Sequence, residues 1–397
     1  MNTTLKHWKE AATVILAAGS KYKRSVESLW RETPGFTTNL RQKTAFDYEV
    51  LLLKRSGKSS FMPNAYVFPG GLVEPSDFSS EWLEVFKAFI HLPMFGLATV
   101  KQPQETRPPI FATDRQQLGS PIPGDVAFRI CAVREAFEES GVLLVVPSDE
   151  ANTLNTDVNA DNEKSDRYVS RSRFTALPDR WDKSLISKWR SLVLQNSANF
   201  ILMCRELECL PNIWALYEWG NWLTPVGGSV RQRRYDTAFY MCCLKHVPDT
   251  LQDQKEIELY KWSTPPEVLH SYQERKLWIA PPQLYDIGRM CNFPLLSDLH
   301  DFAKQRSIEG CERCLPVILK ATDCHISLLP GDSLYPEKTD SNLSTEKCLE
   351  ELQKDSPNLH RIVMHNPYQS SVYINFTPKY KHLPPLTICE SNHEHKL

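Results

Sequence analysis

The sequence predicts a protein of the α/β class, because strand-like and helix-like segments follow one another along the chain. Two short apolar runs near its start, residues 12–18 and 48–53, have the composition of buried strands. Between residues 125 and 140 the apolar side chains instead recur at helical spacing, and Gly141 stands where a left-handed residue commonly ends a helix. Further strand-like and helix-like runs continue up to residue 290.

The composition limits the classes of function. The 397 residues include 46 basic and 48 acidic side chains, and a net charge of −2 gives no overall field for holding a nucleic acid. No apolar run approaches the roughly 18 residues needed to cross a bilayer, so we expect no membrane span. The 11 cysteines are odd in number and widely spaced, which favours reduced thiols over a disulfide scaffold. Any anionic ligand must therefore be held by a local group of charges.

The first elements are two strands and a turn. Residues 11–18 follow two lysines and superficially resemble a signal peptide, but Glu10 directly precedes them and their centre has strand character, so we favour a buried strand. The strand at 48–53 leads through a basic loop into the turn Phe68-Pro69-Gly70-Gly71. A Gly-Gly backbone can approach a metal ion or a phosphate closely, so Gly70 and Gly71 are candidate binding residues.

The middle of the chain predicts an inserted element, a long helix and a polar loop. Large apolar side chains at helical spacing over 82–89 precede a proline-rich stretch, which predicts an insertion over about 78–123. The segment 148–173 is rich in Asn, Asp, Ser and Glu, which predicts a mobile surface loop. Beyond it we expect a helix at 181–194, strands at 237–244 and 256–262, and helices from 265 and at 282–290.

Three glutamates lie on the face of the helix 125–140 that is opposite its apolar stripe. The stripe consists of Val126, Ile130, Val133 and Phe137. The acidic residues are Glu135, Glu138 and Glu139. Like charges three and four residues apart repel each other, and here they also lie beside the negative end of the helix dipole. A cation would relieve both effects, and clustered hard oxygen ligands suit Mg²⁺. A solvated acidic face is the alternative.

The residues around these glutamates match a known signature. The segment Arg134-Glu135-Ala136-Phe137-Glu138-Glu139-Ser140-Gly141-Val142 fits R-E-U-x-E-E-x-G-U, where U is apolar. Its five fixed positions would recur by chance in on the order of one chain in several thousand. On this motif the chain resembles the Nudix hydrolase family. In that family the first half of the signature, a Gly and then a Glu after five residues, commonly follows an F-P-G-G turn.

The chain departs from the family pattern in two ways. The position six residues after Gly71 is Asp77, which is shorter than the expected Glu, and Glu74 is an alternative acid nearby. Fifty-six residues separate Asp77 from Arg134, where the family pattern has seven, so a long insertion interrupts the Nudix box. Such an insertion is tolerable because the entropy cost of closing a loop grows only logarithmically with its length. It resembles the insertion of the peroxisomal acyl-CoA diphosphatases within the family.

The segment before the turn is similar to the motif of Nudix CoA diphosphatases. Leu51-Leu52-Leu53-Lys54-Arg55-Ser56 keeps the register of L-L-T-x-R-S/A, although Leu53 replaces the Thr. Downstream, Ser60 replaces a second Arg and Asn64 replaces a Gly, and Asn still tolerates a left-handed backbone. A phosphate is best held by a guanidinium, so Arg55, with Lys54, is the candidate substrate contact. Both side chains as solvated loop charges are the alternative.

The resemblance implies a fold and an activity. It implies a Nudix α/β/α sandwich with a mixed sheet over about 10–290, followed at 291–394 by a helical and irregular extension. Glu135, Glu138 and Glu139 would bind Mg²⁺ or Mn²⁺, and Arg134 would orient a glutamate. The substrates would be CoA and acyl-CoA, cleaved to 3′,5′-ADP and (acyl-)4′-phosphopantetheine. Another nucleoside diphosphate derivative as substrate, or a non-catalytic binding module with this fold, are the alternatives.

Three weaker signals lie in the second half of the chain. Glu256 and Glu258 occupy a segment in which family members sometimes carry a further metal ligand or base. Cys311 and Cys314 form a CxxC pair that could in principle help to hold zinc, although ordinary thiols are the simpler interpretation. Residues 395–397, His-Lys-Leu, resemble the peroxisomal S-K-L tripeptide, so we expect a peroxisomal location and recognition by an import receptor.

Overall fold

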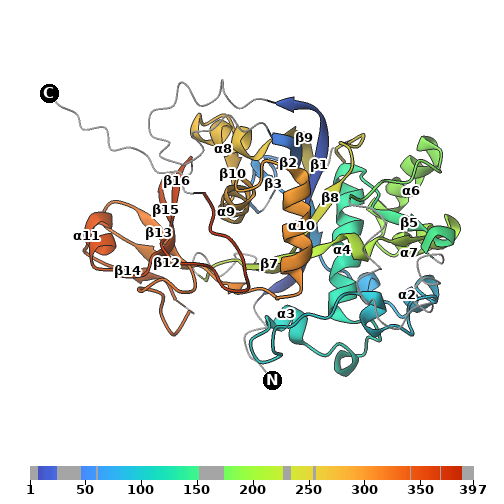
Figure 1. The fold of residues 1–397 in the computed structure, drawn as a ribbon, viewed down its shortest axis with the longest axis horizontal. Coiled ribbons are helices and arrows are strands. Elements are labelled where there is room, and N and C mark those ends of the chain that lie inside the picture. Colours follow the sequence, from blue (N-terminus) through green and yellow to red (C-terminus); the bar gives the residue numbers. More distant parts are fainter. Residues whose placement is uncertain are drawn as a thin grey trace.

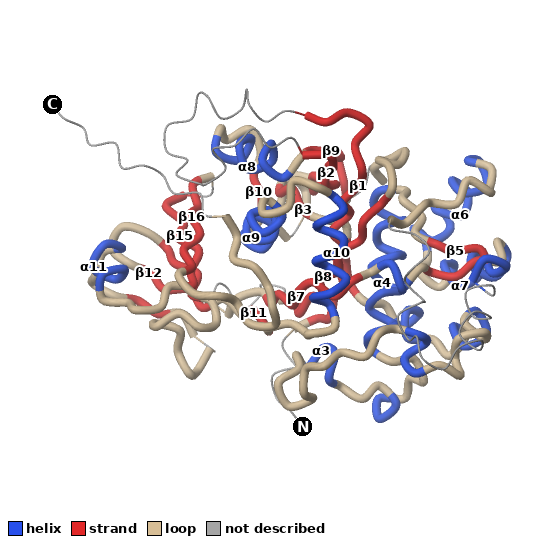
Figure 2. The backbone as a smooth tube through the Cα atoms, viewed as in Figure 1, coloured by secondary structure: helices blue, strands red, loops and turns tan. Residues whose placement is uncertain are grey.

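The structure of the chain is a computed structural model that describes residues 8–24, 46–59, 61–151, 174–226, 234–253, 256–339, 341–366 and 368–386. Within these ranges a large mixed β-sheet lies between two layers of helices, and a smaller β-sheet lies beside one of these layers (Figure 1, Figure 2). The α/β class and the layered architecture expected from the sequence are therefore confirmed.

The large sheet has the strand order β10-β3-β2-β1-β8-β7-β11, with β4 paired to β1 and β9 paired to β2. Its strands are β1 (Lys9–Arg24), β2 (Phe46–Arg55), β3 (Ala65–Val67), β4 (Gly70–Leu72), β7 (Tyr217–Leu223), β8 (Tyr235–Leu244), β9 (Ile257–Ser263), β10 (Trp278–Ile279) and β11 (Arg313–Cys314). The sheet is mixed because β1 runs parallel to β8 and antiparallel to β2. All four strands expected from the sequence are confirmed, and residues 11–18 form the buried middle of β1.

Side chains of β1 alternate between the two helical layers, as the period of a strand requires. Val14 and Leu16 pack in the core of one layer, whereas Ile15 and Ala17 pack in the core of the other. The first layer contains α2 (Trp82–Val85), α3 (Pro109–Ala112), α4 (Gly124–Ser140), α6 (Lys183–Gln195) and α7 (Asn199–Glu206). The second contains α8 (Pro265–Gln273), α9 (Pro281–Met290) and α10 (Leu296–Ser307). The expected helices at 181–194, from 265 and at 282–290 correspond to α6, α8 and α9.

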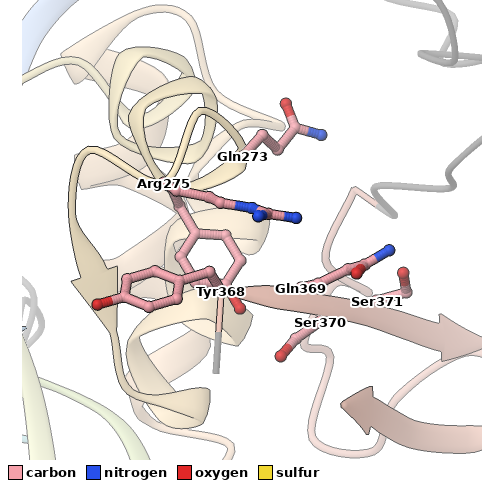
Figure 3. A pocket seen from close by; sticks show the side chains of 7 residues that line it. Gln273, Arg275, Tyr368, Gln369, Ser370 and Ser371 are labelled. Atoms are coloured by element: carbon pink, nitrogen blue, oxygen red, sulfur yellow. The ribbon is translucent and has the colours of Figure 1, made fainter. Parts of the chain in front are cut away.

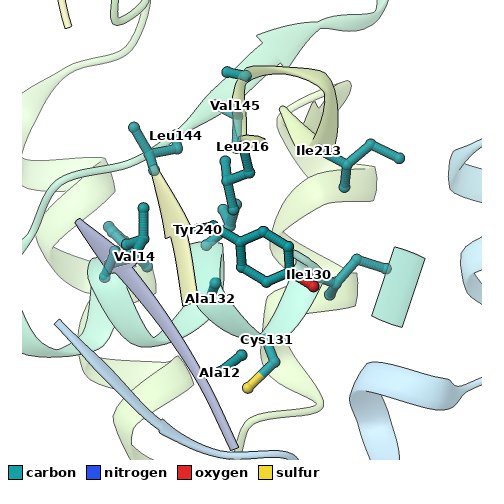
Figure 4. Packing of buried hydrophobic residues seen from close by; sticks show 14 of the residues in the cluster. Ala12, Val14, Ile130, Cys131, Ala132, Leu144, Val145, Ile213, Leu216 and Tyr240 are labelled. Atoms are coloured by element: carbon teal, nitrogen blue, oxygen red, sulfur yellow. The ribbon is translucent and has the colours of Figure 1, made fainter. Parts of the chain in front are cut away.

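Helix α4 is the main support of the first layer. Its expected stripe is fully buried, with Val126, Ile130, Val133 and Phe137 all at 0% exposure. The helix packs on β1 and β8, where Ala12, Val14 and Tyr240 surround it (Figure 4). It ends at Gly141, which has the left-handed φ of 74° that the sequence predicted. Two short strands beside it, β5 (Val145–Pro147) and β6 (Cys209–Pro211), pair antiparallel to each other.

The insertion consists of short helical turns joined by loops. Besides α2 and α3 it contains the 3₁₀ turns η2 (Pro75–Phe78), η3 (Pro93–Gly96) and η4 (Gln116–Leu118). The amphipathic helix expected over 82–89 is wrong in extent, because α2 ends after one turn at Val85. The spacing of the apolar residues indicates burial and not a long helix, because the rings of Trp82, Phe86 and Phe89 lie in the core. Most of the expected mobile loop, residues 152–173, lies outside the described residues.

The segment after residue 290 differs from the irregular extension that the sequence predicted. It begins with α10, which packs Leu296 and Leu299 on the second face of the large sheet, and β11 then adds to the edge strand β7. A five-stranded sheet follows, in the order β14-β12-β13-β15-β16. Its strands are β12 (Val317–Lys320), β13 (His325–Leu328), β14 (Leu343–Ser344), β15 (His360–Asn366) and β16 (Gln369–Ile374), with α11 (Leu349–Lys354) between β14 and β15. The helical part of the expected extension agrees with α10 and α11, whereas this sheet, with a small core of its own, corrects the expected irregular part.

Two expectations about composition can be compared with the described residues. Cys311, Cys314 and Cys324 are buried free thiols. Within the described ranges, no His, Cys, Asp or Glu side chains group with the CxxC pair so that three of them could hold a metal ion. Among the described helices, none is long and apolar enough to cross a membrane.

Candidate active site

The three glutamates of α4 face the Gly-Gly turn and not open solvent. The amide N–H of Gly70 donates to Glu139 Oε2 at 2.9 Å. The Glu135 carboxylate lies against Gly71 so closely that a Cβ added there would be 2.5 Å from its carboxyl carbon. Glu135, Glu138 and Glu139 retain 14%, 16% and 5% exposure. The alternative of a solvated acidic face does not hold, because β4 covers this side of the helix.

Neither glycine of the turn has room for a side chain, because other atoms of the protein lie too close. A Cβ on Gly70 would lie 2.5 Å from the carbonyl oxygen of Ala12 and 2.7 Å from Cα of Thr13, both in the backbone of β1. The turn therefore places β4 in the sheet, with Gly71 opposite Ala12. It also brings its own backbone against Glu135 and Glu139. Gly70 and Gly71 thus position the glutamates, and their expected contact with substrate stays a prediction.

Arg134 holds the acidic residues together. It is 2% exposed, and its NH1 donates to Glu135 Oε1 at 2.9 Å and to Glu138 Oε1 at 2.8 Å. The other side of its guanidinium donates to both carboxylate oxygens of Asp77 at 2.8 Å, and NH2 also donates to the carbonyl of Leu72 at 2.9 Å. A buried guanidinium with all these partners orients carboxylates and is not free to bind an incoming phosphate.

Asp77 takes the place of the first acid of the Nudix box. It is 1% exposed, it accepts the bidentate pair from Arg134, and its Oδ2 also accepts from the amide of Glu74 at 2.9 Å. The Glu74 side chain is exposed. Between the two acids that the sequence left open, the structure brings Asp77 and not Glu74 to Arg134. The two halves of the box therefore meet across the insertion.

The electrostatics of this group favour a cation. Burial raises the pKa of the Glu135 carboxyl to about 7, an effect that Arg134 opposes and the Glu138 charge reinforces. Burial also raises the pKa of Glu138, and burial together with the charge of Glu135 raises that of Glu139. Three carboxylates, those of Asp77, Glu135 and Glu138, share the single guanidinium of Arg134, and Glu139 instead accepts from the Gly70 amide. Excess negative charge on hard oxygen donors suits a divalent cation. In the described arrangement, however, no three of these carboxylates are grouped so that they could hold one, because Glu135 and Glu138 each turn one oxygen to Arg134 and Glu139 is held by the amide.

The two basic residues expected to contact substrate have different surroundings. The Arg55 guanidinium donates to Ser59 Oγ at 3.0 Å and to the Phe61 carbonyl at 3.1 Å, so it holds its own loop, yet its charge still acts on Glu139. Lys54 instead forms an ion pair with Glu258 at 3.4 Å on the neighbouring strand β9. Arg55 therefore lies near the glutamates, whereas Lys54 is directed to another partner. Asn64 has the left-handed φ of 62° that its place in the motif suggested.

A small hollow elsewhere is separate from this group. It lies between the end of α8 and β16, and Arg275 points across it toward Gln369 and Ser371 (Figure 3). Its volume is about 70 Å³. Because α8 covers the face of the sheet opposite α4, this hollow does not belong to the Nudix box.

Two family models match the chain. The NUDT19 Nudix domain matches residues 8–290, and the NUDT19 C-terminal domain matches residues 318–375. The chain belongs to the NUDT19 family of Nudix hydrolases. Divalent metal use is general among Nudix hydrolases, in agreement with the charge of the carboxylate group.

Several relatives of this NUDT19-family chain are similar along almost its full length. Proteins named acyl-coenzyme A diphosphatase NUDT19 from Gallus gallus and Xenopus laevis are each 47% identical, over 98% and 100% of this chain and 97% and 100% of their own lengths. The Homo sapiens protein of that name is 38% identical over 95% of this chain and 94% of its own. The crystal structure of a NUDIX hydrolase from Alicyclobacillus acidocaldarius covers 74% of this chain and 96% of its own, with 16% identity and a TM-score of 0.46.

Sequence reasoning missed one contact of the Nudix helix. Arg190 on α6 donates twice to the Glu138 carbonyl, at 2.8 and 3.1 Å. A cation at the end of α4 offsets the negative end of the helix dipole, which the three glutamates would otherwise make worse. No local motif marks Arg190, because the contact joins residues 52 apart in the chain. Glu256, which the sequence did single out, is exposed, and its charge acts on Glu138 and Glu139.

Proposed function

We propose that this chain is a hydrolase that cleaves the pyrophosphate linkage of CoA and acyl-CoA, releasing 3′,5′-ADP and (acyl-)4′-phosphopantetheine. The observation that carries the proposal is the closed Nudix box, in which Asp77 and Arg134 hold Glu135 and Glu138 beside the Gly-Gly turn. The full-length similarity to proteins named acyl-coenzyme A diphosphatase selects the substrate.

We propose Mg²⁺, or Mn²⁺ in its place, as the cofactor, held by Glu135, Glu138 and Glu139. When bound, such ions neutralise the pyrophosphate and activate a water molecule. The chain contributes the geometry around them. Arg134 fixes two of the carboxylates, the lack of a side chain at Gly71 lets Glu135 lie against the turn, and the Gly70 amide holds Glu139. Arg55 is the basic candidate for a substrate phosphate, since its charge acts on Glu139.

A chromatographic assay tests this function against its two alternatives. Purified protein is incubated with CoA, an acyl-CoA and ADP-ribose, each with Mg²⁺, with Mn²⁺ and with a chelator. We expect metal-dependent release of 3′,5′-ADP from CoA and acyl-CoA. Cleavage of ADP-ribose alone would favour a hydrolase of another nucleoside diphosphate derivative. A folded protein that binds CoA without cleaving any of the three would be a binding module.

We also propose that the protein is located in peroxisomes, with an import receptor as its partner. The support is the resemblance of His395-Lys396-Leu397 to the peroxisomal tripeptide. These residues lie outside the described part of the structure, so the proposal rests on the sequence.

A further inference from the structure

A larger hollow opens beside the Nudix box. It lies between the start of β1, the segment that follows β4 and the insertion, and its volume is about 550 Å³. This volume is within the range of sites that hold small organic ligands. The apolar part of its lining consists of Leu72, Val73, Pro75, Phe78 and Leu118. The hollow therefore offers an apolar surface that the cleavage of a pyrophosphate does not by itself require.

The hollow and the active site share strand β4. Gly71 lies against the Glu135 carboxylate, and the next residue, Leu72, lines the hollow. The carbonyl of Leu72 accepts from Arg134 at 2.9 Å, so the residue that orients the glutamates also fixes this wall. Strand β4 therefore links the two places, and a ligand whose phosphates lie at the glutamates would reach the hollow by extending along this strand.

The distance between the glutamates and the hollow suits the length of the substrate. The ring of Phe78 packs on Phe128 of α4, with the centroids 5.8 Å apart, and Phe128 lies ten residues before Glu138. At a rise of 1.5 Å per residue the two levels of the helix are about 15 Å apart. The pantetheine arm has about twelve bonds between its phosphate oxygen and its sulfur, as many as about four peptide residues, so when extended it has about this length. The thioester end of acyl-CoA would thus reach the hollow.

The polar wall of the hollow carries no net charge. Arg115 donates to both carboxylate oxygens of Glu10, at 2.7 and 2.9 Å, and its guanidinium lies 5.1 Å from the ring centroid of Phe78. Arg115 also donates to the Ile110 carbonyl at 3.0 Å, whereas its buried Nε has no hydrogen-bond partner among the described residues. A guanidinium that is paired and stacked on an aromatic ring can face an apolar group. Arg115, Leu118 and Ser120 all belong to the insertion, so the insertion builds one side of the hollow.

We propose that this hollow binds the acyl chain of acyl-CoA, and that the insertion in the Nudix box thereby sets a preference for acyl-CoA over free CoA. The inference rests on the proposed function, since it concerns the substrate of the same active site. Each methylene that enters an apolar site should raise kcat/KM by up to about fourfold, until the hollow is filled.

The substitution Leu118→Glu tests the proposal with Leu202→Glu as its control. Leu118 is 68% exposed in the hollow and Leu202 is 46% exposed on α7 away from it, so neither change should unfold the protein, and both add one negative charge. The measurement is kcat/KM for free CoA and for straight-chain acyl-CoAs of increasing length. We expect the rise with chain length to flatten in Leu118→Glu and to persist in Leu202→Glu, with free CoA changed by less than about threefold in both.

Three outcomes count against the proposal in distinguishable ways. An unchanged dependence on chain length in Leu118→Glu would show that the hollow does not hold the acyl chain. An equal loss for both variants, on CoA as well as acyl-CoA, would assign the effect to overall charge and would overturn the inference while hydrolysis itself stands. If the unaltered protein cleaves neither CoA nor any acyl-CoA, the proposed function fails, and the acyl-chain inference fails with it.

Discussion

The substitution Gly71→Ala should inactivate the protein without unfolding it. The added Cβ would lie 2.5 Å from the carboxyl carbon and Oε2 of Glu135 and 2.6 Å from its Oε1. Ordinary contacts between such atoms begin at about 3.5 Å, so the carboxylate must retreat by about 1 Å. A displacement of that size at a reacting group costs on the order of 10²-fold in rate. Because the obstacle is the end of a flexible side chain, the loss of stability should stay near about 1 kcal/mol.

Two other glycines give matched controls for this substitution. A Cβ at Gly220 on β7 would meet nothing within 4 Å, so Gly220→Ala should change neither stability nor rate. A Cβ at Gly70 would meet the backbone of β1 at Ala12 and Thr13, so Gly70→Ala should lower the melting temperature clearly. Thermal melting and the initial rate of 3′,5′-ADP release with Mg²⁺ would be measured on all three variants.

Two results would contradict the role assigned to Gly71. Turnover within about threefold of the unaltered protein would mean that the position of Glu135 does not limit the reaction. A melting temperature as low as that of Gly70→Ala would mean that lost folding, and not a displaced carboxylate, explains any lost activity.

Four further predictions concern other parts of the chain. Glu139→Gln should keep the melting temperature and abolish metal-dependent hydrolysis, and near-normal turnover would contradict its role as a metal ligand. Phe137→Ala should destabilise the protein by about 3–5 kcal/mol in denaturant unfolding, because its ring is fully buried; an unchanged midpoint would contradict the packing. Burial lowers the pKa of His360 to about 4, so the folded state favours the neutral ring. The free energy of unfolding should therefore fall by about 2 kcal/mol when the pH is lowered from above 6.5 to 5, because the unfolded chain binds the proton more readily. The variant His360→Gln should show a smaller loss over the same pH range. Deleting Leu397 should move a peroxisomal protein to the cytosol with hydrolysis unchanged, and continued co-fractionation with peroxisomes would exclude the tripeptide as the signal.

The sequence predicted the elements that carry long regular patterns. The stripe of α4 and the apolar run of β1 each span several residues of one period, so both elements were found. The limits of α4 were close to those observed, whereas β1 spans Lys9–Arg24 and extends beyond the expected 12–18 at both ends. The same patterns could not show what covers an element. The acidic side of α4 is half-buried because β4 and η2 fold against it, and that contact joins residues separated by the whole insertion.

Two other features depended on contacts over long distances in the chain. The choice between Asp77 and Glu74 is decided by where η2 places each side chain relative to Arg134, which residue spacing alone does not define. The C-terminal sheet was missed because its strands contain only two to seven residues, and runs that short carry little alternation. The aromatic spacing over 82–89 reflected burial against α7 and Trp214, which sequence patterns do not distinguish from a helix.

The large sheet is completed by residues that lie beyond the matched Nudix segment. Arg306 of α10 is buried and donates to the carbonyls of Glu218 and Gly310, and β11 then hydrogen-bonds to β7. On a ribosome, the sheet that supports the catalytic layer would lack its cover on one face and a strand at one edge until residue 314 has emerged. A chain ending at residue 290 would expose the apolar face that Leu296 and Leu299 cover, and such a face promotes aggregation. A chain that ends at residue 290 would therefore lose the helix α10 and the strand β11 of the large sheet as well as the second matched domain.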